Sequence, residues 1–101
     1  MMKKLKNIHP GEILKEEFLD PMGISVYRLA KETGLSQTRI SQIIKKERSI
    51  TAETALKIGK FFGTGPEFWM NLQTLYDLEE VSRQKAKEVA AIRVYSPRHA
   101  A

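Results

Sequence analysis

The chain has 101 residues, of which 42% are hydrophobic and 29% charged, and its formal net charge is +5 at pH 7. This composition is typical of one soluble globular domain and excludes both a disordered chain and a membrane protein. The absence of cysteine excludes a disulfide framework, a thiolate zinc site and a cysteine nucleophile. Residues 1–6 are basic but lack the apolar core of a signal peptide, so we expect a cytoplasmic protein.

A first helix is predicted to begin at Pro10, because the missing N–H of proline costs nothing in a first helical turn. Its inner face carries Ile13, Leu14 and Phe18. We expect residues 20–23 (DPMG) to end it, since Pro21 disfavours a helical conformation at Asp20.

Two short amphipathic helices are predicted next, with Ser25 and Ser36 as their N-caps. Gly34 suits the left-handed position that ends the first of them, and Leu35 fills the corner between the two. Small and branched apolar residues make up their inner faces: Val26, Leu29 and Ala30 on one, and Ile40, Ile43 and Ile44 on the other. Residues 25–45 therefore have the pattern of a helix-turn-helix.

Thr51 is the predicted cap of a fourth helix, whose expected inward residues are Ala55, Leu56, Gly59 and Phe62. Pro66 begins a fifth helix, which is apolar over more than one face. Such a helix contacts the core on one side and a partner on the other, so we predict a dimer surface there, formed by Met70, Leu75 and Leu78. Beyond it, residues 82–88 are polar on all sides and Ile92 and Val94 weakly indicate a strand.

Basic residues concentrate within residues 37–48. This segment has one acidic residue, Glu47, and four basic residues: Arg39, Lys45, Lys46 and Arg48. A solvated helix face is the alternative explanation for this cluster. In a helix-turn-helix, however, the second helix enters the major groove of DNA and presents its first turns to base edges. The polar outer face predicts base contacts from five residues: Gln37, Thr38, Arg39, Ser41 and Gln42.

A second set of residues is predicted to contact the DNA backbone. Helix N-termini direct backbone N–H groups toward phosphate oxygens, and cations that follow the helix can hold the flanking phosphates. The expected set is Ser25, Tyr27, Ser36, Lys45, Lys46 and Arg48. Double-stranded DNA is therefore the expected partner.

The segment 25–41 (SVYRLAKETGLSQTRIS) resembles the helix-turn-helix of the phage-repressor-like (XRE) family. Three flanking segments narrow the resemblance to the HigA (VapI) antitoxins: 9–14 (HPGEIL), 50–56 (ITAETAL) and 66–73 (PEFWMNLQ). The resemblance implies an all-α, five-helix phage-repressor-like DNA-binding domain with an extended C-terminal helix. It also implies a homodimer that binds double-stranded operator DNA at an inverted repeat and represses its own operon. The same resemblance implies that the protein neutralises an mRNA-cleaving toxin of the RelE/HigB type.

The chain departs from the family at Val26. Many XRE repressors carry a glutamine there, which contacts phosphate and braces the recognition helix. The resemblance spans roughly residues 9–78, so we divide the chain into a helix-turn-helix domain (1–80) and a C-terminal extension with a basic tail (81–101).

Other chemistry finds little support. His9 and His99 lie at opposite ends of the chain without a ligand partner at helical spacing, so we expect no metal site and assign His9 to the entry of the first helix. No histidine is placed to activate a serine, and no phosphate-cradling glycine loop is present, so we expect neither an enzyme nor a cofactor. Two alternatives stay open: a solitary XRE-type repressor, and a protein-interaction adaptor with weak or no DNA binding.

Overall fold

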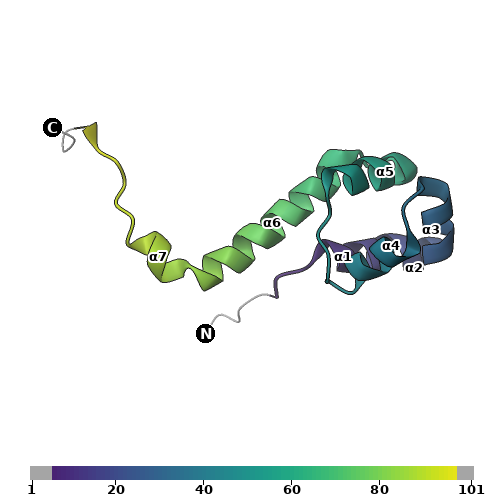
Figure 1. Cartoon of the computed structure of the whole chain (residues 1–101), viewed down its shortest axis with the longest axis horizontal. Coiled ribbons are helices and arrows are strands. Elements are labelled where there is room, and N and C mark those ends of the chain that lie inside the picture. The colour runs from purple at the N-terminus through teal and green to yellow at the C-terminus, as the bar shows by residue number, and fades with distance from the viewer. Residues whose placement is uncertain (1–5, 98–101) are drawn as a thin grey trace.

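The computed structural model describes residues 6–97; residues 1–5 and 98–101, with most of the basic N-terminal run and with His99, lie outside the described range. One helical segment covers residues 10–22, as α1 (Pro10–Ile13), the π-helical η1 (Leu14–Leu19) and α2 (Asp20–Met22). It is followed by α3 (Val26–Thr33), α4 (Gln37–Ile44), α5 (Ala52–Phe62), α6 (Pro66–Gln84) and α7 (Ala86–Ala90) (Figure 1). The all-α prediction is confirmed, and α7 adds a sixth helical segment to the five expected.

Side-chain caps begin the helices where the sequence predicts them. The hydroxyl oxygens of Ser25, Ser36 and Thr51 each accept a hydrogen bond from the backbone N–H three residues later, at 3.0, 3.0 and 3.3 Å. His9 caps α1, where its Nδ1 accepts from the N–H of Gly11 at 2.9 Å, as expected for a residue at the helix entry. These bonds satisfy backbone donors that the first turn of a helix leaves without partners.

The predicted end of this helix within residues 20–23 is confirmed, but the reason given for it, a non-helical Asp20 before Pro21, is wrong. Asp20 keeps helical backbone angles (φ −63°, ψ −52°), and the helix ends only at Gly23, which has a left-handed conformation. The reason is the π-helical stretch, in which the N–H of Asp20 donates to the carbonyl of Lys15, five residues back. This register displaces the carbonyls that a proline ring would meet in an α-helix, so Pro21 fits inside the turn.

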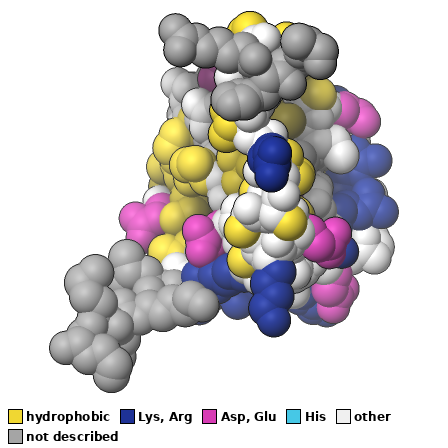
Figure 2. All heavy atoms as spheres, turned by 90° about the vertical axis from the view of Figure 1, so that its left-hand side faces the viewer, with side chains coloured by type: hydrophobic (Ala, Val, Ile, Leu, Met, Phe, Trp, Pro, Cys, Tyr) yellow, Lys and Arg dark blue, Asp and Glu magenta, His cyan; other side chains and the backbone are white. Residues whose placement is uncertain are grey.

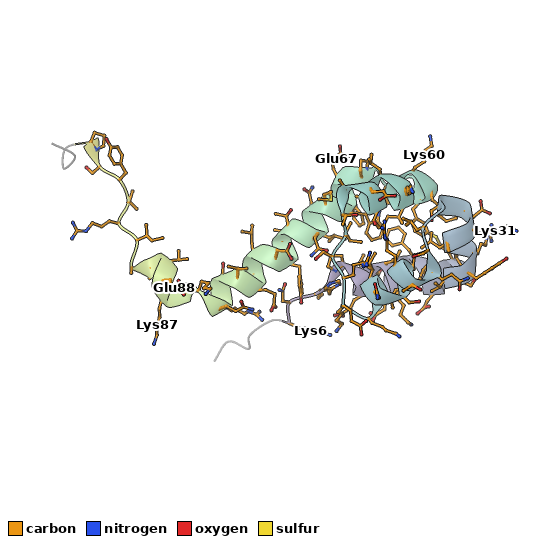
Figure 3. The ribbon with its side chains drawn as sticks, viewed as in Figure 1. Lys6, Lys31, Lys60, Glu67, Lys87 and Glu88 are labelled. Atoms are coloured by element: carbon orange, nitrogen blue, oxygen red, sulfur yellow. The ribbon has the colours of Figure 1, made fainter. Side chains whose placement is uncertain are left out.

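Trp69 is the largest fully buried side chain and joins α6 to the rest of the domain. Its ring centroid lies 5.0 Å from that of Phe18, and its Nε1 donates a hydrogen bond to the Thr64 hydroxyl at 2.9 Å. Completely or almost completely buried aliphatic residues come from every helix of the motif region and from α5: Leu14, Leu29, Ile40, Ile43, Ala55 and Ile58. In Figure 3, side chains fill the space between α5 and the helices of the motif.

Leu56 does not pack inward as predicted, because 59% of its surface is exposed. Ile58 occupies the core from α5 instead, together with Thr54 and Ala55, and each of these is at most 1% exposed. The face of α5 that meets α3 and α6 is thus rotated from the one that the hydrophobic pattern favours. Contacts with two neighbouring helices decide this rotation, and the pattern of one helix does not contain them.

The C-terminal half of α6 leaves the body of the domain and leads to α7 and an extended tail (Figure 1). The principal extents of the molecule, 60 × 36 × 22 Å, reflect this projection. The weakly indicated strand at Ile92 and Val94 does not form, since residues 93–96 have no regular structure and no strand occurs in residues 6–97. No helix in that range is both long and apolar enough to cross a membrane.

At Gly11, α1 lies directly against the backbone of α4. A Cβ atom built on Gly11 would overlap the backbone carbonyl oxygen of Ile43. Any side chain there would therefore separate the two helices and disturb the packing behind α4. The close approach explains why glycine follows Pro10 in the first turn.

We expect Gly11→Ala to lower the free energy of unfolding by about 1–3 kcal/mol, the usual cost of overpacking a buried contact. Chemical denaturation followed by circular dichroism measures the change. Glu17→Ala, an exposed substitution in the same helical segment, serves as the control and should change stability little. Equal stability of the two variants would contradict the close contact.

Candidate nucleic-acid interface

The turn between α3 and α4 has the geometry that a helix-turn-helix requires. Gly34 has a φ of 77°, in the left-handed region that favours glycine, and its N–H donates to the carbonyl of Ala30 at 2.8 Å. Leu35, only 4% exposed, is inserted into the corner between the helices. Ile40 and Ile43 are at most 1% exposed, so α4 lies on the domain by its apolar face and turns its polar face outward.

The five predicted base-contacting residues all lie on α4, but the structure places them differently. Gln37 and Thr38 are exposed in its first turn, which is the part of a recognition helix that reaches bases. Ser41 and Gln42 are half-buried. Arg39 lies between these two pairs and is engaged by another helix.

Arg39 forms an ion pair with Glu53 in the first turn of α5. Its Nη1 donates to Oε1 of Glu53 at 3.2 Å, and Nζ of Lys57 donates to Oε2 of the same carboxylate at 2.9 Å. The ammonium of Lys57, and then the guanidinium of Arg39, hold the pKa of the Glu53 carboxyl below its ordinary value. Glu53 therefore carries its charge beside the recognition helix at any pH near neutrality.

The predicted backbone-contacting residues fall into three groups. Ser25 and Ser36 are exposed at the N-termini of α3 and α4 but already use their hydroxyl oxygens as caps. Tyr27, Lys45 and Arg48 are exposed, which leaves them accessible to a polyanion. Lys46 differs, because its ammonium is paired within the protein.

Nζ of Lys46 lies 2.9 Å from Oε1 of Glu12, while Nζ of Lys6 lies 3.2 Å from Oε2. The side chain of Glu12 is only 15% exposed, and the neighbouring ammonium of Lys46 holds the pKa of its carboxyl below the ordinary value. Lys46 also has a φ of 67°, which is rare outside glycine, so its backbone is held in a strained conformation at the end of α4. The ion pair thus ties this strained turn to α1.

The sequence analysis did not identify Gln73, which has a structural role next to the interface. Its Oε1 accepts a hydrogen bond from the N–H of Ile50 at 2.7 Å, and its Nε2 donates to Asp77 at 2.9 Å. The side chain is 4% exposed, and it fixes the segment between α4 and α5 onto α6. A signal was present, because Gln73 follows the buried Trp69 by four residues and therefore shares its inward face.

Val26 packs against the core from the first turn of α3. It lines a shallow hollow of about 260 Å³ together with Ile24 and Ile44. A valine there supplies apolar packing between α3 and α4 and offers no hydrogen bond to phosphate.

Within residues 6–97, no three histidine, aspartate or glutamate side chains gather as metal ligands.

The predicted dimer residues divide between the two faces of α6. Met70 is half-buried and packs against the core, whereas Leu75 and Leu78 are 65% and 60% exposed. Val81, also exposed, extends this apolar stripe toward the end of the helix. Figure 2, which views the molecule from the C-terminal end, shows hydrophobic side chains gathered on one side.

Comparison with known proteins places this geometry. The helix-turn-helix family model (HTH_3) matches residues 14–69. Virulence-associated protein I of Dichelobacter nodosus is 49% identical over 78 residues, which are 77% of this chain and 72% of that protein. Antitoxin HigA-1 of Vibrio cholerae is 35% identical over 94 residues, covering 91% of this chain and 89% of the relative.

A solved structure, the Pseudomonas aeruginosa antitoxin HigA with higBA promoter, superposes with a TM-score of 0.85 at 36% identity and covers 90% of this chain and all of that one. The chain belongs to the HigA/VapI antitoxin family of helix-turn-helix proteins. This family comprises DNA-binding antitoxins and transcriptional regulators rather than enzymes.

Proposed function

We propose that the chain is an operator-binding antitoxin that inserts α4 into the major groove and represses its own operon as a homodimer. The carrying observation is the orientation of α4, whose isoleucines are buried while Gln37 and Thr38 are exposed. The relative from Pseudomonas aeruginosa, at 36% identity, is described with its promoter DNA, which supports the same target for this chain. Its site of action is the cytoplasm, on the nucleoid.

Base reading is assigned to Gln37, Thr38, Arg39, Ser41 and Gln42, with Gln37 and Thr38 reaching furthest. Glutamine hydrogen-bonds adenine, and arginine hydrogen-bonds guanine, in bidentate fashion. Backbone positioning is assigned to Ser25, Tyr27, Ser36, Lys45, Lys46 and Arg48. Among these, Lys45 contributes more than Lys46, because Glu12 already neutralises Lys46.

Arg39→Ala should cost about 1–3 kcal/mol at one operator base pair and relax specificity there, because a bidentate contact is lost.

Lys45→Ala should weaken binding to all sequences and flatten the salt dependence by about one unit. Lys46→Ala, its neighbour in the chain, is the matched control and should flatten it less. Fluorescence anisotropy titrations against the promoter region of the protein's own gene, at several salt concentrations, measure these effects. Unchanged operator affinity in Arg39→Ala would contradict the assignment of α4 to the groove.

Two copies are needed to read an inverted repeat, and their recognition helices must lie about 34 Å apart, one turn of DNA. The exposed stripe of Leu75, Leu78 and Val81 supports a surface for the second copy, because the core of one copy leaves these side chains uncovered. The C-terminal extension, of which the structure describes residues 81–97, continues from this stripe, so we assign it to the side of the partner copy rather than to the helix-turn-helix domain.

Leu78→Lys should convert the dimer to a monomer and lower operator affinity, since the ammonium would be buried without a partner in the interface. Leu56→Lys is a matched control, because Leu56 is exposed to nearly the same extent, 59% against 60%. Analytical ultracentrifugation reports the mass, and the same anisotropy titration reports binding. A monomeric wild type, or an intact dimer in Leu78→Lys, would refute this surface.

Neutralisation of a RelE/HigB-type, mRNA-cleaving toxin is the second half of the proposal. Its support is the similarity over 91% of this chain to a protein named as an antitoxin. The toxin is expected to be a small basic protein encoded beside this gene. No residue of this chain is assigned to its contact.

Expression of the adjacent reading frame alone should arrest growth, and co-expression of this chain should restore growth and co-purify the toxin as a complex. Growth curves and size-exclusion chromatography provide the readout. An adjacent frame without toxicity would favour a solitary repressor. Rescue by a chain that gives no gel shift at low salt would favour an interaction adaptor.

A further inference from the structure

The ion pair between α4 and α5 links the middle of the recognition helix to a residue outside the helix-turn-helix. Glu53 receives Arg39 on one carboxylate oxygen at 3.2 Å and Lys57 on the other at 2.9 Å. Glu53 lies in the first turn of α5, two residues after the N-cap Thr51. Lys57, one helical turn later, forms an ion pair with it. The Glu53 carboxylate, although 57% exposed, is thus contacted by a cation on each of its two oxygens.

The bond leaves part of the guanidinium available. Nη1 of Arg39 donates to Glu53, whereas Nε and Nη2 have no protein acceptor among residues 6–97. Those two nitrogens form one edge with two parallel N–H donors, which matches the O6 and N7 acceptors of guanine. The Arg39 side chain is 30% exposed, so the pairing restrains it without covering it.

We propose that Glu53 is a positioning residue for base recognition, which holds the guanidinium of Arg39 by Nη1 so that its Nε–Nη2 edge faces guanine. The inference rests on the proposed function, because it requires that Arg39 reads a base. A free arginine loses rotamer entropy when it binds, and a restrained arginine loses less. Glu53 thereby favours guanine over other bases at one operator position.

The same carboxylate also disfavours unspecific contacts. A negative charge beside Arg39 repels the phosphate backbone, so Arg39 is a poor phosphate ligand while it remains paired. In the groove, its free edge meets a neutral base and the ion pair persists. Glu53 thus raises the ratio of specific to unspecific binding from both sides.

A purely structural role for Glu53 makes a different prediction. An acid in the first turn of α5 stabilises the positive end of that helix, and its pair with Lys57 adds support along the helix. Loss of these effects lowers the free energy of unfolding but leaves the preference among bases unchanged. The discriminating readout is therefore base preference, measured on folded protein.

Glu53→Met removes the acceptor and keeps the length of the side chain. A random-sequence DNA duplex pool first yields the preferred site of the wild type, and the guanine that depends on Arg39 is identified with Arg39→Ala. Titrations then compare that site with duplexes changed at this base pair. We expect Glu53→Met to reduce discrimination at this position by roughly tenfold, the lower part of the range for a bidentate contact.

Glu47→Met is the matched control, because it removes one negative charge from an exposed residue just after α4. This variant should strengthen binding to every duplex by the same factor, whatever the base pair, and therefore leave the preference for guanine intact. In the Arg39→Ala background, Glu53→Met should leave base preference unchanged, since the restrained side chain is absent. Thermal unfolding establishes that each variant is folded at the temperature of the titrations.

Equal discrimination in Glu53→Met and Glu47→Met, with Arg39→Ala impaired, would overturn the inference and leave the proposed function standing. A further loss of preference on adding Glu53→Met to Arg39→Ala would also overturn it. If Arg39→Ala has no base-specific effect, or the wild type selects no site, the proposed function itself fails.

Discussion

Complete burial of Ile40 and Ile43 is the constraint on which the DNA-binding face depends. Once these two side chains are covered, the rotation of α4 about its axis is fixed, and its polar side chains, such as the exposed Thr38, face away from the core. Gly11 permits this burial, because it lets α1 lie directly on the backbone of Ile43. The recognition face is therefore set by packing on its opposite side.

Electrostatics then differentiate the cations around that face. Lys45 and Arg48 are exposed, whereas Arg39 and Lys46 hold carboxylates on α5 and α1. Those two acids keep their charge near neutral pH, since the adjacent cations lower the pKa of each carboxyl. A net count of charges over residues 37–48 therefore overstates the attraction for phosphate, because two of the four cations are already paired with carboxylates outside this segment.

The helix α6 serves two environments in turn. Its first half places Trp69 and Gln73 in the core, and Gln73 holds the backbone that leads from α4 to α5. Its second half projects from the domain with an exposed apolar stripe (Figure 1). In Figure 3, Lys87 on α7 points away from the chain, well separated from the helix-turn-helix. The buried residues and the exposed apolar stripe thus lie on different faces of α6 and in different halves of it.

The sequence by itself determined the helix starts, the turn at Gly34 and the inward isoleucines, because caps, left-handed glycines and helical spacing are local properties. Only the tertiary structure decided that Asp20 and Pro21 stay helical after the π-helical stretch, that Ile58 rather than Leu56 enters the core, and that Arg39 and Lys46 are paired. Glu53 and Glu12 are 14 and 34 positions from those cations. Such pairs depend on how separate helices cross, and no spacing within one helix encodes that.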